Sequence, residues 1–189
     1  MPSSTLTGFG PAPTFAENTV SAGPQLLDTN VVFTAGGALT GGRLVVSGLL
    51  VEDRVSILNQ GDAAGQIGVA GSTVSFGGMA IGTMAGGMGA DLTVTFSAGA
   101  TGEAVASLIQ RLAYANDSNT PTAARSLTLD VVNSAGAGLS GGGGINTLTP
   151  LTGTDNPFNG LDVGLISKPT FVDLYGDGDR DLVVGWYVG

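Results

Sequence analysis

The chain has 189 residues, of which 33 are glycine and 11% are charged, and its formal net charge is −9. So acidic a chain lacks the basic surface that binding to nucleic acid or to anionic membranes requires. It contains no Cys and no His, which excludes disulfides, thiolate zinc sites and the Ser-His-Asp triad and leaves hard cations with oxygen ligands. No apolar run approaches the ~18 residues of a membrane span, so no membrane insertion is expected.

The first 14 residues lie in a stretch rich in Pro, Gly, Ser and Thr and predict an extended N-terminal arm. They have neither the basic region nor the apolar stretch of a secretory signal peptide. If the protein is exported, its address is therefore expected elsewhere.

Short apolar segments then follow one another, each closed by Gly, Asn or Asp, which is typical of β-strands joined by turns. Two of them alternate with period 2, as strands with one buried and one solvated face do. Leu92, Val94 and Phe96 alternate with threonines, and the segment from Leu127 to Val131 behaves in the same way. The expected strands are Val31–Phe33, Arg43–Ser47, Val55–Leu58, Ile67–Ala70, Thr73–Phe76, Ala80–Thr83, Leu92–Phe96 and Ser126–Val132.

Turn signals on both sides of Thr73–Phe76 predict a meander: Ala70-Gly71-Ser72-Thr73 before it and Phe76-Gly77-Gly78-Met79 after it. One helix is also predicted. Thr101 is a candidate N-cap, and Glu103 lies in the first turn, where the helix dipole favours a carboxylate. Helical spacing of apolar residues continues from there, through Val105, Leu108, Ile109 and Leu112. We expect this helix to close one end of a β-sandwich.

Residues 134–152 begin with the low-complexity run Ser-Ala-Gly-Ala-Gly-Leu-Ser-Gly-Gly-Gly-Gly and predict a Gly-rich linker. It separates an all-β, antiparallel β-sandwich over residues 15–133 from a tail over residues 153–189 that is too short to bury a core of its own. Six of the fifteen acidic residues follow residue 154. Carboxylates this close repel one another unless a cation lies among them.

Several motifs of the body are similar to one family. They are Val51-Glu52-Asp53-Arg54-Val55-Ser56-Ile57-Leu58-Asn59-Gln60-Gly61, Gly65-Gln66-Ile67-Gly68-Val69, Val74-Ser75-Phe76-Gly77-Gly78, Ala98-Gly99-Ala100-Thr101, Arg111-Leu112-Ala113-Tyr114-Ala115-Asn116 and Asn119-Thr120-Pro121. Together they resemble the cadherin-like (Ig-like) β-sandwich repeats of giant bacterial surface and type I-secreted proteins. The resemblance implies an extracellular, calcium-dependent adhesion or matrix module without catalysis. Type I secretion would also account for the missing signal peptide, since such substrates carry a C-terminal address.

The tail contains Asn156-Pro157-Phe158-Asn159-Gly160-Leu161-Asp162-Val163-Gly164 and then Pro169-Thr170-Phe171-Val172-Asp173-Leu174-Tyr175-Gly176-Asp177-Gly178-Asp179-Arg180-Asp181-Leu182-Val183-Val184-Gly185. It resembles the first repeat of an FG-GAP/VCBS β-propeller, whose acidic loop binds calcium. In that family's pattern the side chains of positions 1, 3, 5 and 9 and the carbonyl of position 7 are ligands. Carried over, these are Asp173, Tyr175, Asp177, Asp181 and Asp179.

Tyr175 departs from the family's Asp or Asn, and its protonated phenol is a poor calcium ligand at neutral pH. The segment is therefore either a calcium loop with one weak ligand or a solvated acidic turn. The resemblance of the body adds weaker candidates in Glu17, Asp53 and Asp117. Two acidic stretches usual in the family read Thr34-Ala35-Gly36-Gly37 and Asn133-Ser134-Ala135-Gly136 here, which predicts that the calcium sites of the body are largely lost.

The sequence is compatible with three functions. The first is a calcium-stiffened adhesive module that acts in a homo-oligomer or beside neighbouring domains, with the unpartnered strand 181–189 or the N-terminal arm donated to another copy. The second is binding of a carbohydrate or surface ligand on an aromatic platform, for which Tyr114, Tyr175, Trp186 and Tyr187 are available. The third is a glycosidase with paired carboxylates. It is disfavoured because the dense carboxylates lie in the metal loop.

Overall fold

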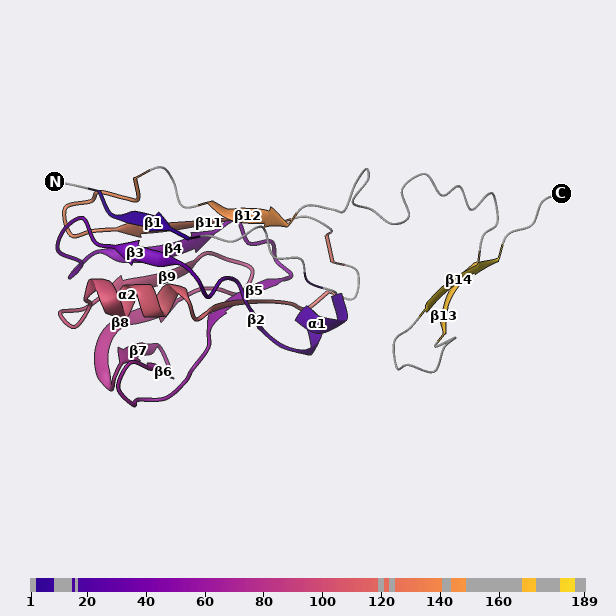
Figure 1. Ribbon diagram of the computed structural model, residues 1–189, viewed down its shortest axis with the longest axis horizontal. Coiled ribbons are helices and arrows are strands. Elements are labelled where there is room, and N and C mark those ends of the chain that lie inside the picture. Colours follow the sequence, from indigo (N-terminus) through magenta and orange to yellow (C-terminus); the bar gives the residue numbers. More distant parts are fainter. Residues whose placement is uncertain are drawn as a thin grey trace. The chain divides into compact units, whose positions relative to one another are not determined.

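The computed structural model describes residues 3–8, 15, 17–118, 121–122, 125–140, 144–148, 168–172 and 181–185. The chain divides into two compact units, Met1–Pro150 and Leu151–Gly189, which are considered separately (Figure 1). All sheet pairings of the named strands are antiparallel, and the described residues contain two short helices. The expected all-β, antiparallel, sandwich-like fold is therefore confirmed.

A seven-stranded sheet with the order β12-β11-β4-β9-β8-β7-β6 forms the larger layer of the first unit. Buried side chains alternate with exposed or partly exposed ones along β9 and β11, as the sequence predicts for both strands. Its strands are β4 Arg43–Ser47, β6 Ile67–Ala70, β7 Thr73–Phe76, β8 Met79–Ala85, β9 Leu92–Phe96, β11 Arg125–Val132 and β12 Gly144–Leu148. The predicted meander is confirmed, since β6 pairs with β7 and β7 with β8.

Two smaller sheets face this layer across the core. One has the order β2-β10-β5 and the other pairs β1 with β3. Leucine, valine and phenylalanine side chains from both layers are buried in one cluster. The strands are β1 Thr5–Thr7, β2 Gln25–Leu26, β3 Val32–Thr34, β5 Asp53–Ile57 and β10 Leu112–Asn116.

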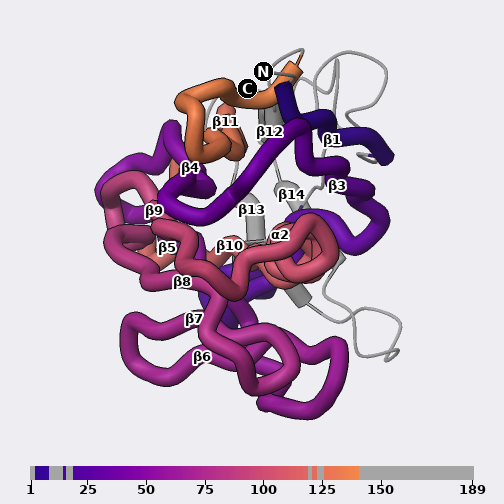
Figure 2. Tube along the Cα trace, turned by 90° about the vertical axis from the view of Figure 1, so that its left-hand side faces the viewer, coloured from indigo at the N-terminus to yellow at the C-terminus, as the bar shows by residue number. Residues whose placement is uncertain are grey.

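Helix α2 (Gly102–Ile109) closes the core beside β3 and β6, with which it is in contact. Figure 2 shows it among the strands of the first unit. The Thr101 hydroxyl accepts a 3.1 Å hydrogen bond from the amide of Ala104, so the predicted N-cap is confirmed. Val105, Leu108 and Ile109 are buried. The helix covers apolar side chains that strands alone would leave in contact with water.

Two elements differ from the expected ones. Leu112, which continues the helical spacing, begins β10 instead, because the helix ends with Gln110 as its C-cap. All five residues of β10 are buried, so the strand lacks the period-2 alternation by which a strand is recognised. A second helix, α1 (Glu17–Ala22), has only six residues, too few for a helical periodicity to stand out.

Both segments that flank the predicted sandwich contribute strands to the first unit. β1 falls within residues 1–14 and pairs with β3. β12 falls within residues 134–152 and pairs with β11. The N-terminal arm and the Gly-rich segment thus each place part of their backbone in hydrogen-bonded strands of the first unit.

In the second unit the described residues form one antiparallel pair, β13 (Lys168–Val172) with β14 (Asp181–Gly185). The register joins Lys168 to Gly185 at one end and Val172 to Asp181 at the other. The strand expected after the acidic segment is present as β14. The expectation that it has no partner within the chain is wrong, because it pairs with β13.

Candidate functional site

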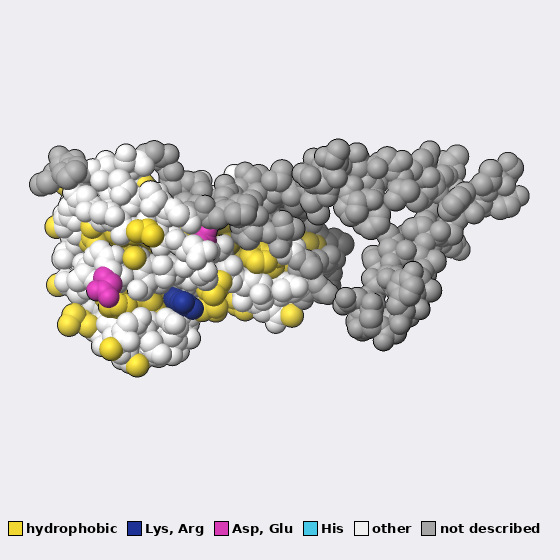
Figure 3. All heavy atoms as spheres, viewed as in Figure 1, with side chains coloured by type: hydrophobic (Ala, Val, Ile, Leu, Met, Phe, Trp, Pro, Cys, Tyr) yellow, Lys and Arg dark blue, Asp and Glu magenta, His cyan; other side chains and the backbone are white. Residues whose placement is uncertain are grey.

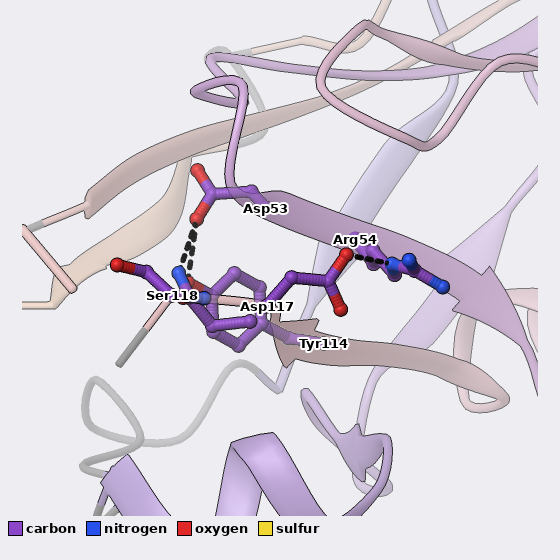
Figure 4. Close-up of polar contacts among 6 residues, drawn as sticks. Asp53, Arg54, Tyr114, Asp117 and Ser118 are labelled. Atoms are coloured by element: carbon purple, nitrogen blue, oxygen red, sulfur yellow. Dashed lines mark hydrogen bonds and ion pairs between the residues drawn. The ribbon is translucent and has the colours of Figure 1, made fainter. Parts of the chain in front are cut away.

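Two of the candidate acids lie where β5 begins and β10 ends. Asp53 is the first residue of β5, and its register partner is Asn116, the last residue of β10. A turn precedes Asp53, whose amide donates a 2.9 Å hydrogen bond to the carbonyl of Leu50. Antiparallel pairing therefore brings Asp53 and Asp117, the residue after Asn116, to the same end of this sheet (Figure 4).

Asp53 is fully buried and accepts hydrogen bonds at both carboxylate oxygens. Oδ1 accepts from the Tyr114 hydroxyl at 2.6 Å and from Nδ2 of Asn116 at 3.0 Å. Oδ2 accepts from the amide of Leu50 at 2.7 Å. Nδ2 of Asn116 also lies 3.0 Å from the Tyr114 hydroxyl. We call Asp53, Tyr114 and Asn116 the Asp53 cluster. Three donors aimed at one buried carboxylate compensate for its loss of hydration.

Asp117 points away from this cluster and pairs with Arg54 at the surface (Figure 4). The two side chains are 53% and 47% exposed, so water weakens their attraction. The backbone of Asp117 donates to the carbonyl of Glu52 at 3.0 Å, and Oε1 of Glu52 accepts from the amide of Thr122 at 2.8 Å. Glu52, Asp53 and Asp117 thus interact with backbone and side-chain groups of the chain itself.

These contacts do not fit a calcium site around Asp53. Calcium needs six to eight oxygen ligands, whereas donor groups occupy both oxygens of Asp53. The described residues contain no group of three or more Asp, Glu, His or Cys side chains that could hold a metal ion. Glu17, the third weak candidate, begins α1, and its side chain lies outside the described part of the structure.

The acidic segment of the tail lies largely outside the described residues. This applies to Asp173, Tyr175, Asp177 and Asp179, and to the side chain of Asp181. The strands on both sides are described, and their register pairs Val172 with Asp181. The two ends of the acidic segment are therefore held together by neighbouring strands. The donor set, three carboxylates and a backbone carbonyl besides Tyr175, fits a hard cation.

The stretches 34–37 and 133–136, in which the cadherin-like resemblance would lead one to expect acids, lie next to each other in the first unit. The amide of Ser134 donates to the carbonyl of Ala38 at 2.9 Å. Oδ1 of Asn133 accepts from the amides of Ala135 and Ala137, each at 3.0 Å. Its Nδ2 is buried next to Gly37 and has no hydrogen-bond partner among the described residues. The side-chain oxygen of Asn133 therefore holds the turn that follows it in place, by accepting from two of its backbone amides.

Tyr114, one of the four aromatic residues available for a carbohydrate-binding platform, is not on the surface. Its side chain is 4% exposed, donates to Asp53, and stacks on Phe15 with the ring centroids 6.4 Å apart. Sequence reasoning did not single out Asn116 as a functional residue. The available signal was the spacing of Tyr114 and Asn116, because residues i and i+2 of a strand share a face.

Comparisons of this chain with protein-family models, with curated proteins and with solved structures find no match. The resemblance to cadherin-like and FG-GAP/VCBS repeats therefore remains a prediction from the sequence. In the part of the chain that the structure describes, neither helix has the length and apolar character needed to cross a bilayer. Charged side chains are sparse on the face shown in Figure 3.

Proposed function

We propose that the protein is a non-catalytic structural or adhesive module of a bacterial cell surface, stiffened by calcium and able to associate with further copies of itself. The observation that carries this proposal is the register of β13 and β14, which pairs Val172 with Asp181. It supports a closed loop between the two strands, in which Asp173, Asp177 and Asp179 are confined to a short connection.

The electrostatics of such a connection favour a bound cation. Carboxylates confined to a few residues repel one another, and a divalent ion removes this repulsion while taking oxygen ligands from alternate positions. Gly176 and Gly178 allow the backbone to turn tightly enough for those positions to converge. A two-stranded hairpin is marginally stable alone, so an ion at its loop adds to the stability of the pair of strands β13 and β14.

The first unit supports a structural role in a different way. Glu52, Asp53 and Asp130 each accept a hydrogen bond from a backbone amide through their carboxylates. This arrangement suits a rigid spacer better than a binding cleft. The described residues give no support to the carbohydrate-binding alternative. They include one of its four candidate aromatic residues, Tyr114, and this side chain is buried.

The test is thermal unfolding together with light scattering, with calcium, with magnesium and with EGTA. At calcium concentrations about 100 times the Kd, binding to the folded state adds ~2.7 kcal/mol to the stability. Magnesium controls for ionic strength and divalent charge, because it demands smaller, octahedral coordination. We expect calcium alone to raise the melting temperature and to increase particle size. Equal melting temperatures in calcium and magnesium would reject the calcium-stiffened module.

A further inference from the structure

Strand β1 occupies a position between two parts of the chain that are remote in sequence. On one side it pairs with β3, with Thr5 opposite Thr34 and Thr7 opposite Val32. On the other side Ser4 forms a parallel bridge with Leu139, and its carbonyl accepts a 2.8 Å hydrogen bond from the amide of Ser140. We call this place, between β3 and residues 139–140, the β1 position.

The β1 position is specific for the sequence that fills it. Ser4 is fully buried, and its hydroxyl accepts a 3.1 Å hydrogen bond from the amide of Gly36. Leu6 packs against the core. At Gly8, φ is 81° and a Cβ would lie 2.6 Å from the carbonyl oxygen of Asn30, so glycine is required. A segment that fits here needs a small polar residue, an apolar residue and a glycine at fixed spacing.

Two other strand edges of the first unit are covered by the chain itself. At β6, the side chains of Asn59 and Gln60 accept hydrogen bonds from the amides of Val69 and Ile67 at 3.0 and 3.2 Å. At β5, the carbonyl of Gly87 accepts from the amide of Val55 at 2.8 Å. Covered edges resist the addition of foreign strands. The β1 position, by contrast, is filled by a short strand that is bonded to β3 on one side and to residues 139–140 on the other.

The connection between β1 and α1 includes Pro11 and Pro13. Proline fixes its own φ and keeps the preceding residue extended. A connection restricted in this way favours extended conformations that carry β1 away from α1, and it disfavours a tight reversal of the chain between them. The hydrogen bonds of β1 are the same whether the strand comes from the same chain or from another, so the connection and the protein concentration decide between the two arrangements.

We propose that β1 of one copy fills the β1 position of a second copy of this chain. This inference rests on the self-association in the proposed function and names the strand that mediates it. The partner is a second copy because the requirements of the β1 position are met by the chain's own Ser4-Thr5-Leu6-Thr7-Gly8. Reciprocal exchange closes a dimer, whereas one-way donation extends a filament.

The absence of cysteine from the chain allows a direct test with disulfides. Thr5→Cys and Thr34→Cys place thiols on exposed register partners of β1 and β3, which antiparallel pairing brings within disulfide reach. The control is Thr83→Cys with Thr95→Cys, another pair of exposed threonine partners, on β8 and β9. These two strands lie inside the sheet and are not terminal, so exchange does not apply to them.

Each pair is tested as a double variant and as a mixture of two single variants of different mass. After oxidation, we expect covalent dimers or longer ladders from the Thr5/Thr34 double variant on a non-reducing gel. We also expect a mixed dimer from its two single variants. The Thr83/Thr95 double variant should stay monomeric, and its mixture should give no mixed dimer.

Three results would overturn the inference. Thr5/Thr34 disulfides found only within monomers, while light scattering shows calcium-dependent assembly, would leave the proposed function standing and remove β1 as its mediator. Monomers in both experiments would remove self-association as well. A Thr5/Thr34 variant that forms no disulfide, while the control pair does, would contradict the register of β1.

Discussion

The hydroxyl of Tyr114 donates a 2.6 Å hydrogen bond to Oδ1 of Asp53, and both side chains are buried. The two residues are 61 positions apart in the sequence. The bond therefore joins β5 to β10 through side chains as well as through the backbone ladder. The bond belongs to the Asp53 cluster, and loss of this cluster should destabilise the whole first unit.

Tyr114→Phe deletes this bond and keeps the ring that packs on Phe15. A hydrogen bond to a charged group contributes about 1.5–3 kcal/mol, so we expect a loss of that size in urea unfolding. Ser75→Ala is the control, because it deletes an exposed 2.8 Å bond from a hydroxyl to the carboxylate of Asp62. That variant should lose about 0.5 kcal/mol or less. Equal losses of unfolding free energy in the two variants would show that the buried hydrogen bond contributes no more than the exposed one.

Asp53→Asn is expected to destabilise the protein more than Asp117→Asn, although both remove one negative charge. The first puts an amide donor among three donors that all need an acceptor, at a cost of about 3 kcal/mol. The second breaks an ion pair that is half exposed, which is worth about 0–1 kcal/mol. Chemical unfolding midpoints of the two variants decide the order, and a reversed order would contradict the role of the Asp53 cluster.

Gly86→Ala should be far more harmful than Gly41→Ala. Both glycines have a positive φ, 78° and 81°, where an L-residue costs about 1–2 kcal/mol. A Cβ at Gly41 meets open space, whereas a Cβ at Gly86 would fall against the carbonyl oxygen of Asp91. We expect Gly86→Ala to lose about 3 kcal/mol or more, measured by thermal unfolding. If the two variants melt alike, the close approach of residues 86 and 91 is relieved at little cost.

Asp177→Asn and Asp179→Asn separate a calcium loop from a solvated acidic turn. In the proposed loop Asp177 binds through its side chain and Asp179 through its backbone carbonyl. Asp177→Asn should weaken calcium binding by roughly tenfold or more, since affinity follows the charge of the ligands, while Asp179→Asn should change it little. Titration calorimetry measures both. Equal effects would indicate that the carboxylates act only through their summed charge.

Much of the sandwich could be predicted from the sequence because its signals are local. Alternation marks β9 and β11, glycine-containing turns mark the meander of β6, β7 and β8, and Thr101 marks the start of α2. Each of these depends on residues within one element or one turn. Local consistency of this kind is what periodicity and capping rules detect.

The Asp53 cluster could not be predicted, because it depends on which residues of two distant strands face each other. Only the register of β5 and β10 brings Asp53 opposite Asn116. The burial of β10 on both faces also removed the alternation that would have identified it as a strand. The sequence alone therefore does not reveal that the hydroxyl of Tyr114 donates a hydrogen bond to a buried acid.

The pairing of Ser4 with Leu139 and of Leu148 with Arg125 has a mechanical consequence. Leu139 follows the turn after Val132, so Ser4 lies near one end of β11 and Leu148 lies at the other. Tension applied to the first unit through these two residues runs along the strands. The hydrogen bonds of β1 and β12 are then sheared together and cannot be opened one at a time.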